Sequence, residues 1–208
     1  MHIIMGAAEE FDEIAGDWDE FKREPLEAAC LLAGMAEKAD RALLVGCGNA
    51  RNACLLKKFD FIEGVDASPR MVEFAKAKGL KAAIADAQNL PFNGACFNAV
   101  FYFAVLHHLD PQGLDKALQE ARRVLKQGGR AYATLWFKKN KSGYCPIAWK
   151  KKDGVIIKRS YWFYSLDELK KAAESNCFKI IDAFYEARGE RSNKGSATNT
   201  CLVLEKED

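Results

Sequence analysis

Short apolar runs alternate with helical stretches along the chain, and three successive runs end in residues suited to a ligand site. The run at 42–46 ends in glycine, and the runs at 61–66 and 81–86 each end in an aspartate. Strands that alternate with helices form parallel sheets through right-handed crossovers. Because such sheets bind ligands at the carboxyl ends of their strands, we expect the glycine turn, Asp66 and Asp86 to meet at one edge.

The rest of the pattern extends the same arrangement. Helical periodicity predicts two N-terminal helices within 9–38, the second opened by Pro25, and further helices at 49–58, 69–78, 112–126 and 166–176. Four more strands are expected at 97–105, 130–137, 178–186 and 200–206. The last two lack an intervening helix, which favours an antiparallel hairpin at the sheet edge. The predicted fold is α/β, with a Rossmann-like, doubly wound, mostly parallel sheet.

Length and composition exclude several other classes of protein. With 208 residues, 49% of them hydrophobic, the chain suits one domain with a sizeable core. Its longest apolar run, 99–106, has eight residues, whereas roughly 18–20 are needed to span a bilayer. The seven cysteines are scattered without a C-x2-C pair, which favours reduced thiols over a metal site or disulfides. The start lacks the basic region of a secretory signal, so a soluble, cytoplasmic chain with no membrane contact is expected.

A cofactor site is predicted where the first strand ends. Gly46-Cys47-Gly48 allows a tight turn through which the backbone can approach a ligand. Asp66 follows Gly48 by 18 residues, where a carboxylate can accept hydrogen bonds from ribose hydroxyls. The alternative is that Asp66 caps the helix that begins near Pro69. Arg51 stands where a dinucleotide fingerprint has its third glycine, which is a departure from that fingerprint.

Five segments carry a family resemblance that covers about residues 42–137. In order and spacing they resemble the core motifs of the class I S-adenosylmethionine-dependent methyltransferases: LLVGCGNAR, EGVDASPRM, ADAQNLPF, FNAVFYFAVLHHL and RVLKQGGRAY. The N-terminal FDEIAGDWDEF is similar to the lid helix of these families. The resemblance implies a seven-stranded sheet with the last strand inserted antiparallel. It also implies S-adenosyl-L-methionine as cofactor and S-adenosyl-L-homocysteine as product.

The resemblance assigns roles to individual residues. It implies that the glycine turn faces the methionine part of the cofactor, Asp66 the ribose and Asp86 the adenine edge. Met71 is implied at the adenine face, and the backbone of Phe103 near the sulfonium. The full set of implied cofactor contacts is Trp18, Lys22, Arg23, Gly46, Cys47, Gly48, Asp66, Ala67, Met71, Asp86, Ala87 and Phe103.

Two positions depart from the family pattern. Leu44 replaces the acid that usually precedes the glycine turn, so the methionine ammonium lacks one partner. Ala50 replaces the usual third glycine, although alanine is small enough for close approach. Lys22 or Arg23 is available for the methionine carboxylate, and Trp18 is similar to the aromatic residue that closes over this end of the cofactor.

The sequence singles out no catalytic residue. Methyl transfer from a sulfonium is an in-line displacement, in which a protein mainly positions and desolvates the reactants. A general base is required only where the acceptor must lose a proton. His107 and His108 follow the fourth strand, beside the expected methyl group, and are the candidates for a base or a substrate contact. The alternative is that both are ordinary members of a turn.

The segment 138–159 concentrates positive charge. It holds eight Lys and Arg residues against Asp153, a charge of +7, which leaves −5 for the rest of a chain whose total is +2. Cations suit phosphates and aromatic side chains suit unstacked bases, so the segment favours a polyanion held over the acceptor pocket. The alternative is a solvated basic hairpin. The candidate substrate-binding residues are Lys138, Lys139, Lys141, Trp149, Lys150, Lys151, Lys152, Arg159 and Tyr161.

A single domain is expected over residues 1–208. Its parts are an N-terminal helical lid (1–40), a cofactor-binding core (41–137), a basic substrate-side insertion (138–164) and a final helix with a hairpin (165–208).

A looser similarity extends to the tRNA wobble-uridine methyltransferases, through FDEIAGDWDEF, GCGNAR, AVLHHL, ATLWF and the basic segment. That family esterifies a carboxymethyl group on the wobble uridine and acts with a small zinc-binding activator subunit. The resemblance implies a methyltransferase acting on RNA, with tRNA and such an activator as partners. Two alternatives remain: a methyltransferase for small molecules of the quinone or natural-product type, and a non-catalytic binding or partner subunit with the same fold.

Overall fold

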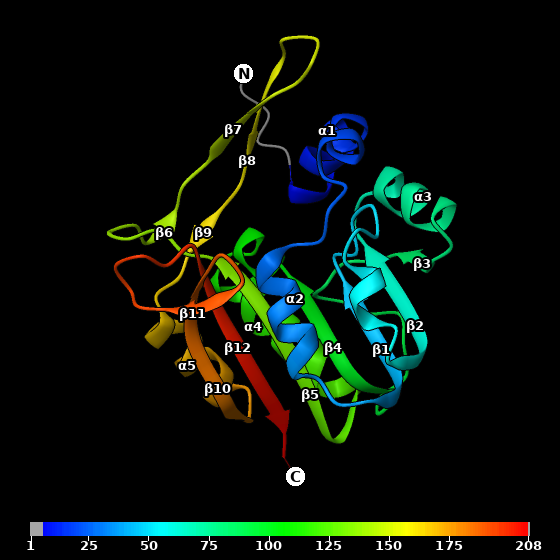
Figure 1. The fold of residues 1–208 in the computed structure, drawn as a ribbon, viewed down its shortest axis with the longest axis vertical. Helices are drawn as coiled ribbons and strands as arrows, with labels where there is room; N and C mark the ends of the chain where they lie inside the picture. Colours follow the sequence, from blue (N-terminus) through cyan, green and yellow to red (C-terminus); the bar gives the residue numbers. More distant parts are fainter. Residues whose placement is uncertain (1–5, 208) are drawn as a thin grey trace.

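An eight-stranded sheet runs through the computed structural model, which describes residues 6–207 (Figure 1). The strand order is β11-β10-β12-β5-β4-β1-β2-β3. The strands are β1 (Ala39–Val45), β2 (Phe59–Asp66), β3 (Lys81–Ile84), β4 (Phe97–Phe103), β5 (Leu125–Trp136), β10 (Phe178–Ala187), β11 (Glu190–Ser192) and β12 (Asn199–Lys206). Pairs among β1 to β5 are parallel, whereas β10, β11 and β12 pair antiparallel. The predicted fold class is therefore confirmed.

The last strand lies inside the sheet. β12 pairs with β5 on one side and with β10 on the other. Its central residues 201–204 are buried, and a continuous apolar run of this kind suits a strand that is covered on both faces. The predicted antiparallel pairing of the last two long strands and the implied insertion of the last strand are confirmed. Their predicted place at the sheet edge is wrong, because the outer edge of β10 pairs with a further strand, β11. The three-residue β11 covers part of that edge.

Helices cover both faces of the sheet within residues 6–207. They are α1 (Ala7–Phe21), α2 (Glu27–Met35), α3 (Pro69–Ala77), α4 (Pro111–Val124), α5 (Leu166–Ser175) and two 3-10 helices, η1 (Ala53–Leu56) and η2 (Leu106–His108). Apolar residues of α4 and α5 share one core cluster with the sheet, and those of α2 and α3 share the other. Ser68, Asp110 and Ser165 cap α3, α4 and α5 by accepting a backbone N–H, as expected for helix N-termini. None of these helices, over the described residues, is long and apolar enough to cross a membrane.

The helix predicted over 49–58 is wrong. Only the four-residue η1 forms there, because the backbone turns sharply at Ala50, where φ is +61°. Asn49 and Asn52 are buried, and their side chains hydrogen-bond to the end of α1 and to the connection between α1 and α2. These long-range bonds fix a compact loop, and α2 packs on η1 to cover this part of the sheet.

The basic segment forms a two-part β-ribbon. β6 (Gly143–Tyr144) pairs with β9 (Trp162–Phe163), and β7 (Ile147–Lys150) pairs with β8 (Ile156–Arg159). We call residues 143–163 the basic ribbon. It rises above the sheet beside α1, so that two segments far apart in sequence form a roof over the carboxyl ends of the parallel strands (Figure 1).

Candidate functional site

The glycine turn after β1 is shaped by its neighbours. Gly46 and Gly48 have φ values of +62° and +52°, a region that favours glycine. A Cβ on Gly46 would lie 2.4 Å from a methyl carbon of Val105, so the position has no room for a side chain. Gly46 therefore borders the cavity described below with its backbone alone.

Asp66, at the end of β2, holds this turn in place. Its Oδ2 accepts the backbone N–H of Gly48 at 2.7 Å, and its Oδ1 accepts that of Ser68 at 3.0 Å. Burial raises the pKa of Asp66, although these backbone donors favour its charged form. The cap of α3 is Ser68, whose hydroxyl accepts the N–H of Met71 at 3.2 Å. Asp66 is therefore not the cap of α3, and each of its carboxylate oxygens has a further lone pair that can accept a hydrogen bond from a ligand.

A cavity of about 810 Å³ lies between the strand ends and the roof, within the roughly 300–1,000 Å³ typical of small-molecule sites. Of the residues predicted to bind the cofactor, all except Arg23 line it. Strand-end residues form its floor, and α1 and the basic ribbon supply its upper wall. The predicted residues that it brings together are Trp18, Lys22, Gly46, Cys47, Gly48, Asp66, Ala67, Met71, Asp86, Ala87 and Phe103.

The residues that line this cavity fit S-adenosylmethionine. Met71 and Ala87 are buried apolar residues that suit the flat adenine ring, and Asp66 suits the ribose hydroxyls. Lys22 and Arg51 are cations that line the cavity and would suit the methionine carboxylate. When bound, the cofactor supplies a methyl group on a sulfonium, and the remaining chemistry belongs to the acceptor and to the residues of this chain.

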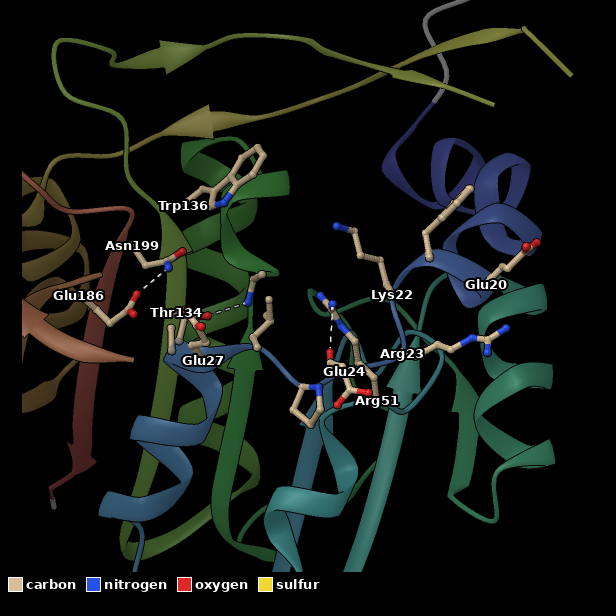
Figure 2. Close-up of a pocket in the computed structure, with 15 residues that line it drawn as sticks. Glu20, Lys22, Arg23, Glu24, Glu27, Arg51, Thr134, Trp136, Glu186 and Asn199 are labelled. Atoms are coloured by element: carbon tan, nitrogen blue, oxygen red, sulfur yellow. Dashed lines mark hydrogen bonds between the residues drawn. The ribbon is translucent and has the colours of Figure 1, made fainter. Parts of the chain in front are cut away.

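A second cavity of about 460 Å³ adjoins the first (Figure 2). Lys22, Leu26, Arg51, Ala104 and Trp136 line both cavities and form their common wall. Lys22 points into the space between the strand ends and the α1–α2 connection (Figure 2).

Two hydrogen bonds join residues that line the second cavity. The buried carboxylate of Glu186 accepts the amide of Asn199 at 2.6 Å, and the N–H of Ala104 donates to the hydroxyl of Thr134 at 3.0 Å (Figure 2). Ala104 has a φ of +61°, a strained value for alanine at the end of β4. Arg23 lines only this cavity, so its predicted contact with the cofactor differs from its position in the structure.

Three residues beside the glycine turn were missed by the sequence reasoning as site residues. Asn49 donates from Nδ2 to Asp19 and to the carbonyl of Lys22, both at 2.9 Å, and thereby ties the lid to the turn. The Oδ1 of Asn52 accepts the N–H of Leu26 at 3.0 Å. Arg51 stacks its guanidinium on Trp18, with Cζ 5.6 Å from the ring centre. The signal for all three was the polar run NARN directly after the glycines.

The two histidines carry their protons on different nitrogens. The Nδ1 of His107 accepts the N–H of Trp136 at 2.9 Å, so its proton is on Nε2. The Nδ1 of His108 donates to the carbonyl of Ser160 at 2.8 Å, which leaves Nε2 as an acceptor. Burial lowers both pKa values, that of His108 to about 4, so both rings are neutral at pH 7. Tyr161 packs against the two rings, with centres 5.0 and 4.5 Å away.

The two strands of the β7–β8 hairpin have an inner and an outer face. Side chains directly across an antiparallel pair share a face, and faces alternate along each strand. The register places Ile147, Trp149, Ile157 and Arg159 on one face, where they are wholly or partly buried, and Ala148, Lys150, Ile156 and Lys158 on the exposed face. The predicted substrate-binding residues are therefore divided between cavity and solvent.

The remaining predicted substrate-binding lysines fall into two groups. Lys151 and Lys152 both lie beside carboxylates: Lys151 Nζ is 3.3 Å from Asp153 of the same hairpin and 3.9 Å from Glu13 of α1, and the Lys152 ammonium pairs with Glu20 of α1. The backbone N–H of Lys152 also donates to Asp17 at 2.7 Å. The second group is exposed in the connection between β5 and β6 and consists of Lys138, Lys139 and Lys141. Lys151 and Lys152 thus already have carboxylate partners in the structure, whereas the lysines of the second group are exposed.

Comparison with known proteins identifies a methyltransferase domain at residues 43–133. The chain is 31% identical over 140 residues to the tRNA (carboxymethyluridine(34)-5-O)-methyltransferase of Xenopus tropicalis, a match covering 64% of this chain and 22% of that protein. It is 34% identical over 139 residues to the malonyl-[acyl-carrier protein] O-methyltransferase of Herminiimonas arsenicoxydans, with 62% and 48% covered. The chain thus spans a fifth to a half of the length of these relatives.

Among solved structures, a Haloferax volcanii methyltransferase in complex with the Trm112 methyltransferase activator has the same fold. The TM-score is 0.77 at 16% identity, with 98% of each chain covered. The match to the family model falls on β1 to β5, which supply the glycine turn and Asp66. Residues 43–133 therefore carry a methyltransferase domain, and the chain as a whole has the fold of the Haloferax methyltransferase.

Proposed function

We propose that the protein is an S-adenosylmethionine-dependent methyltransferase that acts on tRNA in the cytoplasm. The observation that carries this proposal is that the predicted cofactor residues, except Arg23, line one cavity, and that the basic ribbon supplies part of the wall of this same cavity. Lysines on the outer face of that ribbon and in the 137–142 connection are free to meet phosphates. A relative with a tRNA methyltransferase name adds support.

The site suits an acceptor that is already ionised. In an in-line displacement the chain's contribution is to position two reactants and exclude water. His107 and His108 are neutral, and the Nδ1 atom of each is engaged with the backbone, so neither is built to serve as a strong base at pH 7. A carboxylate acceptor needs no base. The two relatives described above are both named as O-methyltransferases, which agrees with an oxygen acceptor.

An activator subunit belongs to the same proposal. The Haloferax methyltransferase, which covers the whole of this fold, was solved with the Trm112 activator bound. We include a small activator of that kind among the partners of this chain. The activator proposal is tested by copurifying the chain with such a subunit. The affinity for S-adenosylhomocysteine is then compared with and without the subunit.

A small-molecule acceptor is the second candidate function. Trp149, Tyr161 and Trp162 on the roof line the cofactor cavity and make its upper wall aromatic, which suits an apolar acceptor. The Herminiimonas relative is named for an acceptor other than RNA. A third possibility, a binding subunit without catalysis, is favoured by the buried Leu44 in place of the family's acid.

Asp66→Asn tests the cofactor assignment. Loss of a charge-assisted hydrogen bond costs about 1.5–3 kcal/mol, so S-adenosylhomocysteine should bind roughly ten- to a hundredfold more weakly by calorimetry. Asp60→Asn, at the exposed start of the same strand, should leave affinity unchanged. Wild-type affinity in Asp66→Asn would refute the ribose assignment. No binding by the wild-type chain would leave only the non-catalytic reading.

Lys150→Glu/Lys158→Glu tests the RNA assignment. Both lysines are exposed on the outer face of the hairpin, so the double variant should weaken tRNA binding at least about tenfold and lower the salt slope by about 1 to 2. Lys116→Glu/Lys171→Glu, with the same charge change on α4 and α5, serves as the control. Equal weakening in both variants, or none in either, contradicts a phosphate surface on the ribbon and moves the proposal to a small-molecule acceptor.

A further inference from the structure

Arg159, on the inner face of the basic ribbon, is a buried cation without a counter-charge. Only 5% of its surface is exposed. Within residues 6–207 its guanidinium makes no hydrogen bond or ion pair, and its Nε is a buried donor without a partner. Glu10 acts on it only at longer range. The two carboxylate oxygens of Glu10 instead accept the N–H and the hydroxyl of Ser160, each at 2.8 Å.

Aromatic rings enclose the faces of this guanidinium. Its Cζ lies 5.1 Å from the ring centre of Trp149, 5.2 Å from Tyr161, 5.7 Å from Trp18 and 5.9 Å from Phe11. Ring faces attract a cation, but they do not replace in-plane acceptors for its five N–H bonds. Burial without acceptors is costly, and arginine does not escape that cost by losing its proton at neutral pH. The arrangement is therefore one that a bound anion would stabilise.

A second unpaired donor lies beside the first. The indole Nε1 of Trp149 is also buried without a partner in the described part of the chain. Arg159, Trp149, Trp18 and Tyr161 all line the same 810 Å³ cavity as Asp66. The planar fork of a guanidinium matches the two oxygens of a carboxylate, and an indole N–H adds a further donor.

We propose that Arg159 and the Trp149 indole form a carboxylate-binding subsite that holds the methyl acceptor. This inference rests on the proposed function and deepens it, because it names the residues that select an anionic acceptor. The cofactor has a carboxylate of its own, but Lys22 and Arg51 are the cations on the wall between the two cavities (Figure 2), and we assign that group to them.

The subsite is compatible with transfer to oxygen. One carboxylate oxygen stays with the donors of the subsite while the other forms a bond to the methyl carbon. The carbon–sulfur bond of the sulfonium breaks, and its electron pair returns to sulfur. The products are a methyl ester and a neutral thioether, and no proton moves. The ester has lost its negative charge, so it binds the subsite more weakly than the acceptor and leaves.

Acetate is the probe, because it presents the carboxylate alone. Its binding to the S-adenosylhomocysteine-loaded protein is measured by saturation-transfer NMR on the methyl protons, with acetamide as the uncharged analogue. Arg159→Met removes the charge, and Arg159→Lys retains charge without the fork. Trp149→Phe removes the indole donor while keeping a ring. Lys158→Met, one residue away on the outer face, is the matched control.

We expect acetate, but not acetamide, to bind the wild type and Lys158→Met. Acetate affinity should fall about ten- to a hundredfold in Arg159→Met and less in Arg159→Lys and Trp149→Phe. S-adenosylhomocysteine affinity should stay unchanged throughout. The proposed subsite is overturned if acetate binds Arg159→Met as tightly as the wild type, or if acetate does not bind the wild type. A tenfold loss of S-adenosylhomocysteine affinity in Arg159→Met also overturns it, because the carboxylate would then be the cofactor's. Failure of the wild type to bind S-adenosylhomocysteine instead counts against the proposed function.

Discussion

The two imidazoles beside the cavity illustrate how single atoms decide a residue's chemistry. His107 and His108 are adjacent, yet one receives a hydrogen bond at Nδ1 and the other donates from it. Burial disfavours the charged form of both rings, which keeps the pKa of His108 at about 4. Within residues 6–207 the Nε2 of His108 makes no hydrogen bond, so this ring can accept a hydrogen bond from a donor group of the bound substrate.

This depressed pKa has a consequence for stability. Between pH 6.5 and 4 the unfolded chain binds a proton at His108 that the native chain does not, so stability falls as the pH falls through this window. The decrease in unfolding free energy from pH 6.5 to pH 5 should be about 2 kcal/mol smaller in His108→Gln than in the wild type. Urea denaturation followed by tryptophan fluorescence at both pH values measures the difference. Parallel pH dependence in the variant and the wild type contradicts it.

Residue roles were predictable where the signal is local. The glycine turn and Asp66 are marked by their places at strand ends, and the structure brings them together at the expected edge of the sheet. The lid contact of Asn49 spans 30 residues, and the Glu10–Ser160 contact beside Arg159 spans 150. Partners so distant leave no periodicity in the sequence. Arg159 was therefore grouped with the surface lysines, although it is buried in a ring of aromatic side chains.

Charge complementarity joins two elements from distant parts of the chain. The acidic helix α1 faces the hairpin of β7 and β8, where Lys152 binds its carboxylates and Lys151 lies between Glu13 of the helix and Asp153 of the hairpin. The ammonium of Lys152 also lies 5.2 Å from the centre of the Phe21 ring. The charge asymmetry noted in the sequence is therefore partly internal, because some of the positive segment neutralises the negative one.

Lys152→Glu should loosen this roof. Exposed ion pairs contribute roughly 0–1 kcal/mol each, so amide exchange in α1 and the β7–β8 hairpin should accelerate up to about fivefold. Added salt should have the same effect on the wild type, because it screens the pairs. Hydrogen–deuterium exchange followed by mass spectrometry measures both.

Lys150→Glu provides the matched comparison for that experiment. It makes the same charge change two residues away, on the solvent face of the hairpin. Exchange should stay at the wild-type rate in this variant. If the two variants behave alike, the roof is held by its aromatic contacts and not by the ion pairs.

At the scale of the molecule, the succession of strands and most helices along the chain was predictable from periodicity alone. Each long strand was predicted within a few residues of its observed bounds, except that β5 begins at Leu125, ahead of the two glycines expected to precede it. The failure over 49–58 has a physical cause. The alanine, leucine and lysine residues of this segment favour helix locally, but hydrogen bonds of Asn49 and Asn52 with α1 and the α1–α2 connection stabilise a turn instead.

The place of β12 in the sheet bears on how the protein is made. On the ribosome, β5 emerges with one edge bare, and its partner β12 follows only after residues 137–198 have been translated. At roughly 5–20 residues per second, that edge waits for several seconds. An unpaired strand edge recruits other chains, so a chaperone that shields β5 during this interval would raise the yield of folded protein. What becomes the centre of the finished sheet is therefore left unpaired until the last strand has been made.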